Sequence, residues 1–295
     1  SDRKIMYSFY EVDPSMRAEP NEILASIVSE EQEAAEEVRK SELEKEKRRT
    51  EGPKTLNDAL LMEVERLEEL ELETNKGSSR SSMRSIAREI RALNDAGIAS
   101  AALQVGRMAP DFKLPLCSNP KKTYELKKLI KKSGGSIVIL FLHGDWSPFC
   151  RIALKAWNEK YETLQAKGAG LVAISPSQCD EQMIKVDFPI LWDEQNVVAK
   201  QFRLRYQMDA QLHGQMQPWP LPMTATYVVG NTSNGAEILF AHADCDHTKR
   251  ADPVTVIANH VPAGKATYKR KRGAFSLRLR GWLPIGNKQK VAASQ

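Results

Sequence analysis

Apolar residues gather into short runs in the middle of this chain. Residues 137–142 are all apolar, and a second, mostly apolar run covers 170–176. Runs of this length are typical of central strands that are covered on both faces of a sheet. The segment between them predicts a helix, because its large apolar residues recur at helical spacing: Leu154, Trp157, Tyr161 and Leu164. A helix that connects two strands in this way makes the strands parallel.

The later part of the chain predicts an antiparallel hairpin. Strand-like segments over 225–230 and 236–242 are joined by a short polar connection that ends at Gly235. Short helices are predicted over residues 126–131, 195–202 and 253–260. The resulting order, β-α-β-α-β-β-α, is that of an α/β, thioredoxin-like fold.

The N-terminal part of the chain has a different pattern. Residues 1–28 show no clear periodicity, and no element is predicted there. Residues 29–51 are dense in Glu, Lys and Arg and have almost no large apolar side chains. Such a segment forms a solvated helix through ion pairs between residues four apart, and Gly52-Pro53 ends it.

A helix with an apolar stripe is predicted next. Thr55 is a good N-cap residue, and Asp58 three positions later approaches a capping box. The stripe consists of apolar residues at helical spacing: Leu56, Leu60, Val64, Leu67 and Leu70. A polar linker then leads to a third predicted helix over 84–96, which Gly97 caps.

These patterns divide the chain into four parts. They are a charged N-terminal extension over 1–54, a helical segment over 55–104, the thioredoxin-like domain over 105–262 and a basic C-terminal tail over 263–295. A chain of 295 residues, of which 41% are apolar, is long enough to bury a sizeable core, although only part of the chain has that apolar content.

Neither a transmembrane segment nor a secretory signal peptide is visible. The longest apolar run has the length of a strand, well short of the roughly 18 residues that a membrane helix needs. The sequence begins at Ser1 rather than at a methionine. We expect a soluble, non-secretory protein. An organelle such as the chloroplast or the mitochondrion, after removal of a transit peptide, is one alternative for its compartment.

The basic character belongs to the C-terminal tail. The whole chain has a net charge of +5, but the segment from Lys265 to Lys290 has nine basic residues and no acidic one, so that the remainder is net negative. Together with the N-terminal helices, the tail is expected to dock on a protein partner or a large assembly. The residues assigned to this contact are Lys269, Arg270, Lys271, Arg272, Arg278, Arg280 and Trp282. RNA, a membrane surface and a solvated tail without a partner remain alternatives.

The four cysteines are widely spaced and form no C-x-x-C pair, which argues against a structural zinc site and a disulfide scaffold. We therefore expect Cys117, Cys179 and Cys245 to be unconnected thiols in a reducing compartment. The segment HADCDH over 242–247 has the residue types of a zinc site. Adjacent residues point in alternate directions, however, and rarely converge on one ion. Neither a metal nor another cofactor is expected.

The turn after the first central strand carries the candidate chemistry. Residues 144–150 have the sequence GDWSPFC and precede the predicted helix. Further segments accompany this turn: TLNDAL at 55, GIASAALQVGRMAPDFKLP at 97, GLVAISP at 170, FPILWDEQNVVAKQF at 188, MTATYVV at 223 and CDHTKRADP at 245. In their order and spacing, they resemble the peroxiredoxin-like (AhpC/TSA-type) family of the thioredoxin-fold superfamily.

The resemblance implies a thiol-dependent peroxidase that uses a single cysteine. Bacterial members of this branch typically have W-C-P-Y-C at the turn, whereas this chain has W-S-P-F-C and lacks the first cysteine. Cys150 falls on the position of the peroxidatic cysteine of peroxiredoxins, Ser147 on that of a functional threonine, and His143 on that of a proline. Cys150 and Ser147 are therefore the candidate catalytic residues.

A cysteine at the start of a helix has a physical reason to react. Unpaired backbone N–H groups and the positive end of the helix dipole stabilise a thiolate there. Attack of Cys150 on a peroxide O–O bond would give a sulfenic acid. Arg151 would support the thiolate with positive charge, whereas Asp145 opposes it. Cys179 or Cys245 would serve as the resolving thiol if it lay near enough.

Other features favour a structural role. Peroxiredoxins typically place an arginine, and thioredoxins a cis-proline, just before the strand that here begins at Ala225, but this chain has Thr224. Long charged extensions at both ends suit a subunit of an assembly better than a free-standing enzyme. The alternative is therefore a catalytically degenerate domain that serves as a structural or linker subunit of a large assembly, such as an organellar ribosome or a photosynthetic or respiratory complex.

Overall fold

The structure is a computed structural model that describes residues 20–74, 83–144, 146–179, 185–208 and 219–264. The chain falls into two compact units. One contains the helix α1, and the other spans the chain from Lys54 to Arg280. Every tail residue assigned above to partner binding lies outside the described residues, as does Asp145.

The helix α1 covers Pro20–Glu51 and is exposed over most of its described length. It confirms the predicted charged helix, but it begins at Pro20, within the segment for which no element was predicted. Ion pairs one turn apart support it, such as that between Lys40 Nζ and Glu36 Oε1 at 2.8 Å. Among the helices of the described ranges, none is both long enough and apolar enough to cross a membrane.

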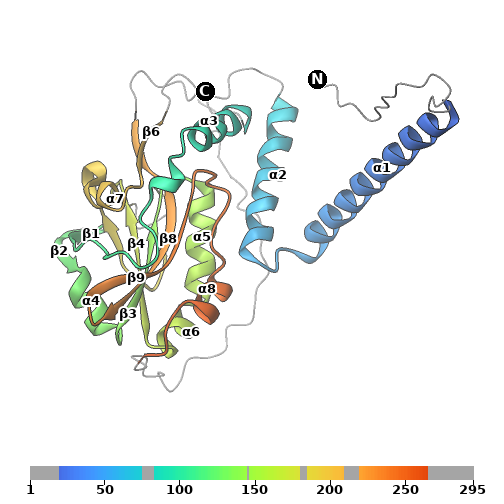
Figure 1. Cartoon of the computed structure of the whole chain (residues 1–295). Coiled ribbons are helices and arrows are strands. Elements are labelled where there is room, and N and C mark those ends of the chain that lie inside the picture. Colours follow the sequence, from blue (N-terminus) through green and yellow to red (C-terminus); the bar gives the residue numbers. More distant parts are fainter. Residues whose placement is uncertain (1–19, 75–82, 145, 180–184, 209–218, 265–295) are drawn as a thin grey trace, which may run out of the picture. The chain divides into compact units, whose positions relative to one another are not determined.

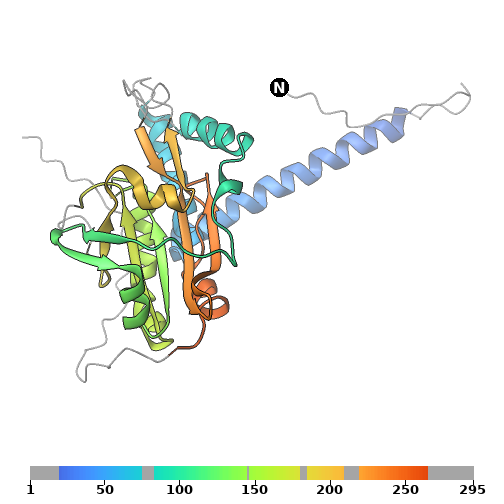
Figure 2. The ribbon, with the colours of Figure 1, turned by 60° about the vertical axis from the view of Figure 1, so that its left-hand side comes forward.

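A seven-stranded sheet forms the centre of the larger unit, with strand order β2-β1-β5-β4-β3-β8-β9 (Figures 1 and 2). The strands are β1 Lys113–Leu116, β2 Asn119–Glu125, β3 Ser136–Phe141, β4 Ala169–Ser175, β5 Ile190–Trp192, β8 Thr224–Thr232 and β9 Gly235–Asp244. β3, β4 and β5 are parallel, and β8 and β9 form an antiparallel hairpin beside β3. The predicted α/β, thioredoxin-like fold is confirmed. The separate pair β6 Arg205–Met208 and β7 Trp219–Pro222 was not predicted.

The central strand β3 is buried on both faces, as its apolar sequence predicts. Its residues alternate between two hydrophobic clusters: Ile137, Ile139 and Phe141 face one cluster, and Val138 and Leu140 face the other. Because both faces are packed, the end of β3 is a fixed point from which the following turn starts.

Helices cover both faces of this sheet. The cluster around Val138 includes residues of α5 Pro148–Glu159, α6 Tyr161–Ala166 and α8 Pro253–Asn259. The cluster around Ile139 includes residues of α4 Leu126–Lys132 and α7 Val197–Gln201. The remaining helices of the larger unit are α2 Leu56–Thr74, α3 Met83–Asp95 and two short 3-10 helices at Ala99–Ala101 and Glu194–Asn196.

The helix α2 begins with the predicted capping box. The hydroxyl oxygen of Thr55 accepts a hydrogen bond from the N–H of Asp58 at 3.1 Å, and the Asp58 carboxylate accepts one from the N–H of Thr55 at 2.9 Å. The apolar stripe of α2 packs on α5, where Leu56 and Leu60 share a cluster with Phe149 (Figure 1). The helix α5 is therefore held between the sheet and α2.

Leu154 is one of the residues that hold α5 on the sheet, since its side chain is fully buried one turn beyond Cys150. We expect Leu154→Ala to lower the free energy of unfolding by about 2–5 kcal/mol, through lost apolar burial and the cavity that remains. The control Val254→Ala, at an exposed position of α8, should change it by less than about 0.5 kcal/mol. Equal effects of the two substitutions in urea unfolding, followed by circular dichroism, would contradict this packing of α5.

Candidate functional site

The segment Gly144–Cys150 turns the chain from β3 into α5. Ser147 has an extended backbone and is the N-cap residue of α5, and Pro148 occupies the first turn. The hydroxyl oxygen of Ser147 accepts a hydrogen bond from the N–H of Cys150 at 3.4 Å. The predicted position of Cys150 in the first turn of a helix is thereby confirmed.

Cys150 carries a free thiol whose residue is 0% exposed. It lies between α5 and the sheet, in one cluster with Leu142 and Leu154. The first turn of a helix has backbone N–H groups without intrahelical partners, and Ser147 satisfies one of them. The hydroxyl of Ser147, a candidate catalytic residue, therefore caps the helix.

Arg250 brings a positive charge to this sulfur. Its Nη2 lies 3.5 Å from the Sγ of Cys150, and its Nε donates a hydrogen bond to the carbonyl oxygen of His247 at 2.8 Å. Arg250 and Cys150 are 100 positions apart in the sequence. The sheet brings them together, because Arg250 follows β9, β9 pairs with β8, and β8 pairs with β3. A guanidinium stays charged at all physiological pH values, so the sulfur has a permanent cation beside it.

A tight turn after β9 holds Arg250 in place. The carboxylate of Asp246 accepts hydrogen bonds from the N–H of Thr248 at 3.0 Å and from its hydroxyl at 2.6 Å. The N–H of Asp246 donates to the carboxylate of Asp244 at 2.8 Å, and the N–H of Lys249 donates to the carbonyl oxygen of Asp246 at 2.9 Å. These local bonds stabilise the turn. In the pattern D-x-T-K-R, the Asp and Thr therefore form the turn and the Arg reaches the sulfur.

Aromatic rings surround this pair of groups. The ring centroid of His143, at the end of β3, lies 5.5 Å from that of His247 and 6.2 Å from that of Trp146. Burial lowers the pKa of His143 well below its usual value, and electrostatic interactions with His247 and Arg250 lower it further. His143 is therefore neutral at physiological pH.

Tyr206 in β6 and Thr224 in β8 are buried residues that carry hydroxyl groups. The ring of Tyr206 lies 6.3 Å from that of His143, and burial, together with a nearby carboxylate and two thiols, raises the pKa of Tyr206. The phenol therefore stays protonated. The Oγ1 of Thr224 is buried and has no hydrogen-bond partner within the described residues. In those ranges, no three side chains of His, Cys, Asp or Glu lie close enough to hold a metal ion.

Arg151, the sequence neighbour of Cys150, contacts the turn itself. Its Nη1 donates a hydrogen bond to the carbonyl oxygen of Trp146 at 3.1 Å, and the guanidinium contact to the sulfur comes from Arg250 instead. The sequence analysis missed Arg250, because it looked for an arginine at the position of Thr224. The signal was present in the segment CDHTKRADP, but sequence spacing alone does not show which residues are close in space.

Two of the remaining cysteines are connected. Cys117, between β1 and β2, forms a disulfide with Cys179, which follows β4 and lies 62 positions further along the chain. The prediction of unconnected thiols is wrong for this pair. The two cysteines are far apart in the sequence but close in space, because β1 and β4, which precede them, lie on either side of β5 in one sheet. The sulfur of Cys179, a candidate resolving thiol, is thus bonded to Cys117.

Cys245 is a free thiol that belongs to the cluster on the opposite face of the sheet from Cys150. Its sulfur lies 3.5 Å from the Sδ of Met223. Burial raises the pKa of the Cys245 thiol, so it stays protonated and is a poor nucleophile near neutral pH. Its role as a resolving thiol stays a prediction.

Known proteins with similar sequences share this central region. The sequence profile of the AhpC/TSA family matches residues 105–234. Over 112 residues, this chain is 29% identical to Peroxiredoxin 2 of Thermoplasma acidophilum and 28% identical to a peroxiredoxin of Thermoplasma volcanium. The matches cover 34% of this chain and 53% and 52% of the two relatives. The chain therefore spans about half the length of the curated relatives it matches.

Solved structures of similar arrangement include peroxidoxin BcpB from Mycobacterium tuberculosis, with a TM-score of 0.41, 21% identity, and coverage of 53% of this chain and 95% of that chain. Peroxiredoxin Q of Xanthomonas campestris has a TM-score of 0.41 and 16% identity, and the match covers 54% of this chain and 95% of that chain. The profile match contains the turn with Cys150 and ends before Arg250. Residues 105–234 are therefore similar in sequence to the AhpC/TSA family.

Proposed function

We propose that this chain is a thiol-dependent peroxidase with Cys150 as its single reacting cysteine. The observation that carries the proposal is the 3.5 Å contact between the sulfur of Cys150 and the guanidinium of Arg250. A cation at hydrogen-bonding distance favours the anionic form of a thiol, and this form is the nucleophile.

The reaction would proceed in two stages. In the first, the thiolate of Cys150 attacks a peroxide oxygen, the O–O bond breaks, and the leaving oxygen takes a proton, so that a sulfenic acid and water or an alcohol form. Arg250 would stabilise the negative charge that develops on the oxygens. In the second, a thiol reductant attacks the sulfenic sulfur and releases water, and a second thiol reduces the mixed disulfide to restore Cys150.

A peroxide needs an opening of the turn to reach the sulfur. Cys150 is fully buried, whereas Trp146 in the same turn is 43% exposed. Polar contacts at the start of α5 include the 3.4 Å bond between Cys150 and Ser147, the contact of Cys150 with Arg250, and the bond from Arg151 to Trp146. Local opening of this first turn is therefore a step of the proposed reaction.

The helix α1 favours a second role, attachment to a partner. It is 32 residues long, which corresponds to about 48 Å, and it exposes Val28, Val38 and Leu43 among its charged residues. A helix that forms a unit distinct from the core and exposes apolar side chains suits a binding partner. Together with the basic tail, it would attach the domain to a protein partner or a larger assembly, with RNA as the alternative for the tail.

Cys150 should be oxidised faster than the other free thiol. We expect micromolar hydrogen peroxide to convert Cys150 selectively to a sulfenic acid, which dimedone traps and mass spectrometry locates. Cys150→Ser should abolish peroxide consumption in the presence of a thiol reductant. Cys245→Ser is the matched control and should retain it, because Cys245 is buried on the opposite face and protonated. Oxidation of Cys150 no faster than that of Cys245 would favour the degenerate structural domain instead.

Arg250→Met should slow the oxidation of Cys150 by about 10- to 100-fold. A hydrogen bond to a charged group contributes about 1.5–3 kcal/mol, and each 1.4 kcal/mol changes a rate about tenfold. Arg151→Met removes one positive charge from the residue next to Cys150 but leaves the sulfur contact, so we expect a loss of less than about threefold. Stopped-flow measurement of peroxide consumption compares the two variants. Similar losses would show that overall charge, rather than the Arg250 contact, controls the reaction.

A further inference from the structure

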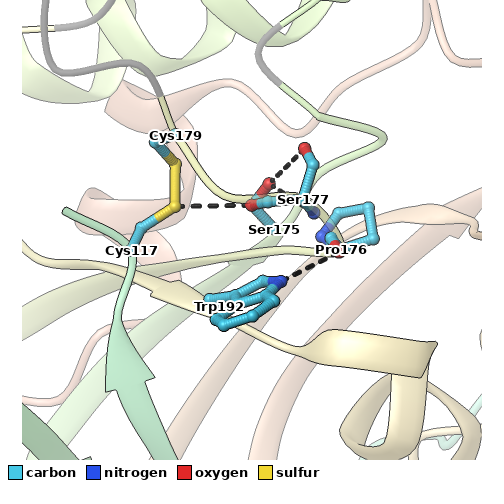
Figure 3. The surroundings of a disulfide bond; sticks show 6 residues. All are labelled: Cys117, Ser175, Pro176, Ser177, Cys179 and Trp192. Atoms are coloured by element: carbon cyan, nitrogen blue, oxygen red, sulfur yellow. Dashed lines mark hydrogen bonds between the residues drawn. A yellow bond between two sulfur atoms is a disulfide. The ribbon is translucent and has the colours of Figure 1, made fainter. Parts of the chain in front are cut away.

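The disulfide between Cys117 and Cys179 belongs to the hydrophobic cluster that contains Cys150, but it has no part in the reaction proposed for Cys150. Figure 3 shows the disulfide beside Ser175, Ser177 and Trp192. Cys117 is buried, and Cys179 is half-buried. An external thiol therefore has better access to the sulfur of Cys179 than to that of Cys117.

The bond clamps the segment 175–179 onto β5. The N–H of Cys117 donates a hydrogen bond to the carbonyl oxygen of Ile190 in β5 at 2.8 Å. A second contact comes from Trp192, also in β5, whose Nε1 donates to the carbonyl oxygen of Pro176 at 3.3 Å (Figure 3). The segment after β4 is therefore held by one covalent bond and by hydrogen bonding to its neighbouring strand.

Ser177, in the segment after β4, packs against Gly144, where the turn Gly144–Cys150 begins. A Cβ atom at Gly144 would lie 3.1 Å from the Oγ of Ser177 and 2.6 Å from the Nε1 of Trp146. Gly144 also has a φ of 139°, which favours glycine. Ser177 and Trp146 thus both lie close to Gly144, on the side where a side chain would project. A displacement of Ser177 removes part of the support of the turn that leads to Ser147.

Cys117 has a partner in both redox states. Its Sγ lies 3.4 Å from the carbonyl oxygen of Ser177. A disulfide sulfur has no hydrogen, so in the oxidised state this is a close contact rather than a hydrogen bond. The thiol that reduction produces would have an S–H donor beside an acceptor that is already in place. Reduction therefore leaves no buried donor without a partner at Cys117.

We propose that Cys117 and Cys179 form a reversible disulfide that restricts access to Cys150, and that a dithiol reductant opens it. In the oxidised state, the clamped segment holds Ser177 against Gly144 and keeps the turn closed. In the reduced state, hydrogen bonds alone hold the segment 176–179, and the turn opens more often. The clamp itself does not depend on the proposed function. Only its consequence does: the rate of the proposed peroxidase would depend on the reduction of Cys117 and Cys179.

The chemical step is a pair of thiol–disulfide exchanges. A thiolate of the dithiol attacks the Sγ of Cys179, the bond to Cys117 breaks, and the sulfur of Cys117 leaves as a thiolate that takes up a proton. The second thiol of the reductant then attacks the reductant's own sulfur in the mixed disulfide. Cys179 leaves as a thiol, and the reductant becomes a cyclic disulfide, so that two electrons pass to the protein.

The test compares the accessibility of Cys150 in the two redox states of the full chain. The oxidised protein is treated with dithiothreitol, freed of it by anaerobic desalting, and labelled with N-ethylmaleimide, and mass spectrometry follows each cysteine. We expect reduction to speed the labelling of Cys150 about tenfold, which corresponds to a local opening that is easier by about 1.4 kcal/mol. The variant Cys117→Ser/Cys179→Ser should label at the faster rate with or without dithiothreitol, and Cys245→Ser should respond as the unaltered protein does.

A second variant tests the contact path while the disulfide is intact. Ser177→Gly removes the side chain that packs on Gly144, and it should raise the labelling rate of Cys150 in the oxidised protein. The proposal is overturned if the disulfide resists dithiothreitol in the folded protein, or if the labelling rate of Cys150 is the same in the oxidised protein, the reduced protein and Ser177→Gly. If the labelling rates change as expected but Cys150 does not consume peroxide in either state, the proposed peroxidase function fails and the clamp stands.

Discussion

A cation held against a buried sulfur is the interaction on which the rest of this site depends. The guanidinium of Arg250 needs a partner for each buried N–H, and the carbonyl oxygen of His247 accepts from one of them. That carbonyl is in position only because Asp246 and Thr248 form the turn after β9. The position of this turn depends on the pairing of β9 with β8 and of β8 with β3. The contact between Arg250 and Cys150 therefore depends on the pairing of three strands, β3, β8 and β9.

Features that neighbouring residues determine follow from the sequence. The apolar run gives β3, Thr55 with Asp58 gives the start of α2, and Ser147 gives the start of α5, because each depends on residues within one or two turns of chain. The contact of Arg250 with Cys150 joins residues 100 positions apart, and the disulfide joins residues 62 positions apart. Both depend on the strand order of the sheet, which periodicity alone does not define.

In the proposed peroxidase, the positive charge beside the sulfur would come from a different part of the fold than the family pattern implies. The resemblance to peroxiredoxins implied an arginine at the position that Thr224 occupies, and its absence argued for a degenerate site. The structure provides the positive charge from the segment after β9 instead. His143, which replaces a proline of the family pattern, stays neutral close to this cation, since burial and the charges around it oppose its protonation. A second positive charge there would repel the first.

The position of Arg250 near the end of the domain has a consequence for the order in which the protein is made. A ribosome releases the chain from its N-terminus, so Cys117, Cys150 and Cys179 all emerge before β8 and β9 exist. The parallel pair β3 and β4 can form at that stage, but the hairpin that completes the sheet beside β3 cannot. For that interval the nascent chain exposes three thiols, two of which are bonded to each other in the finished domain. The docking of β5 between β1 and β4 brings Cys117 to Cys179 and so selects this pair, which leaves Cys150 as a free thiol.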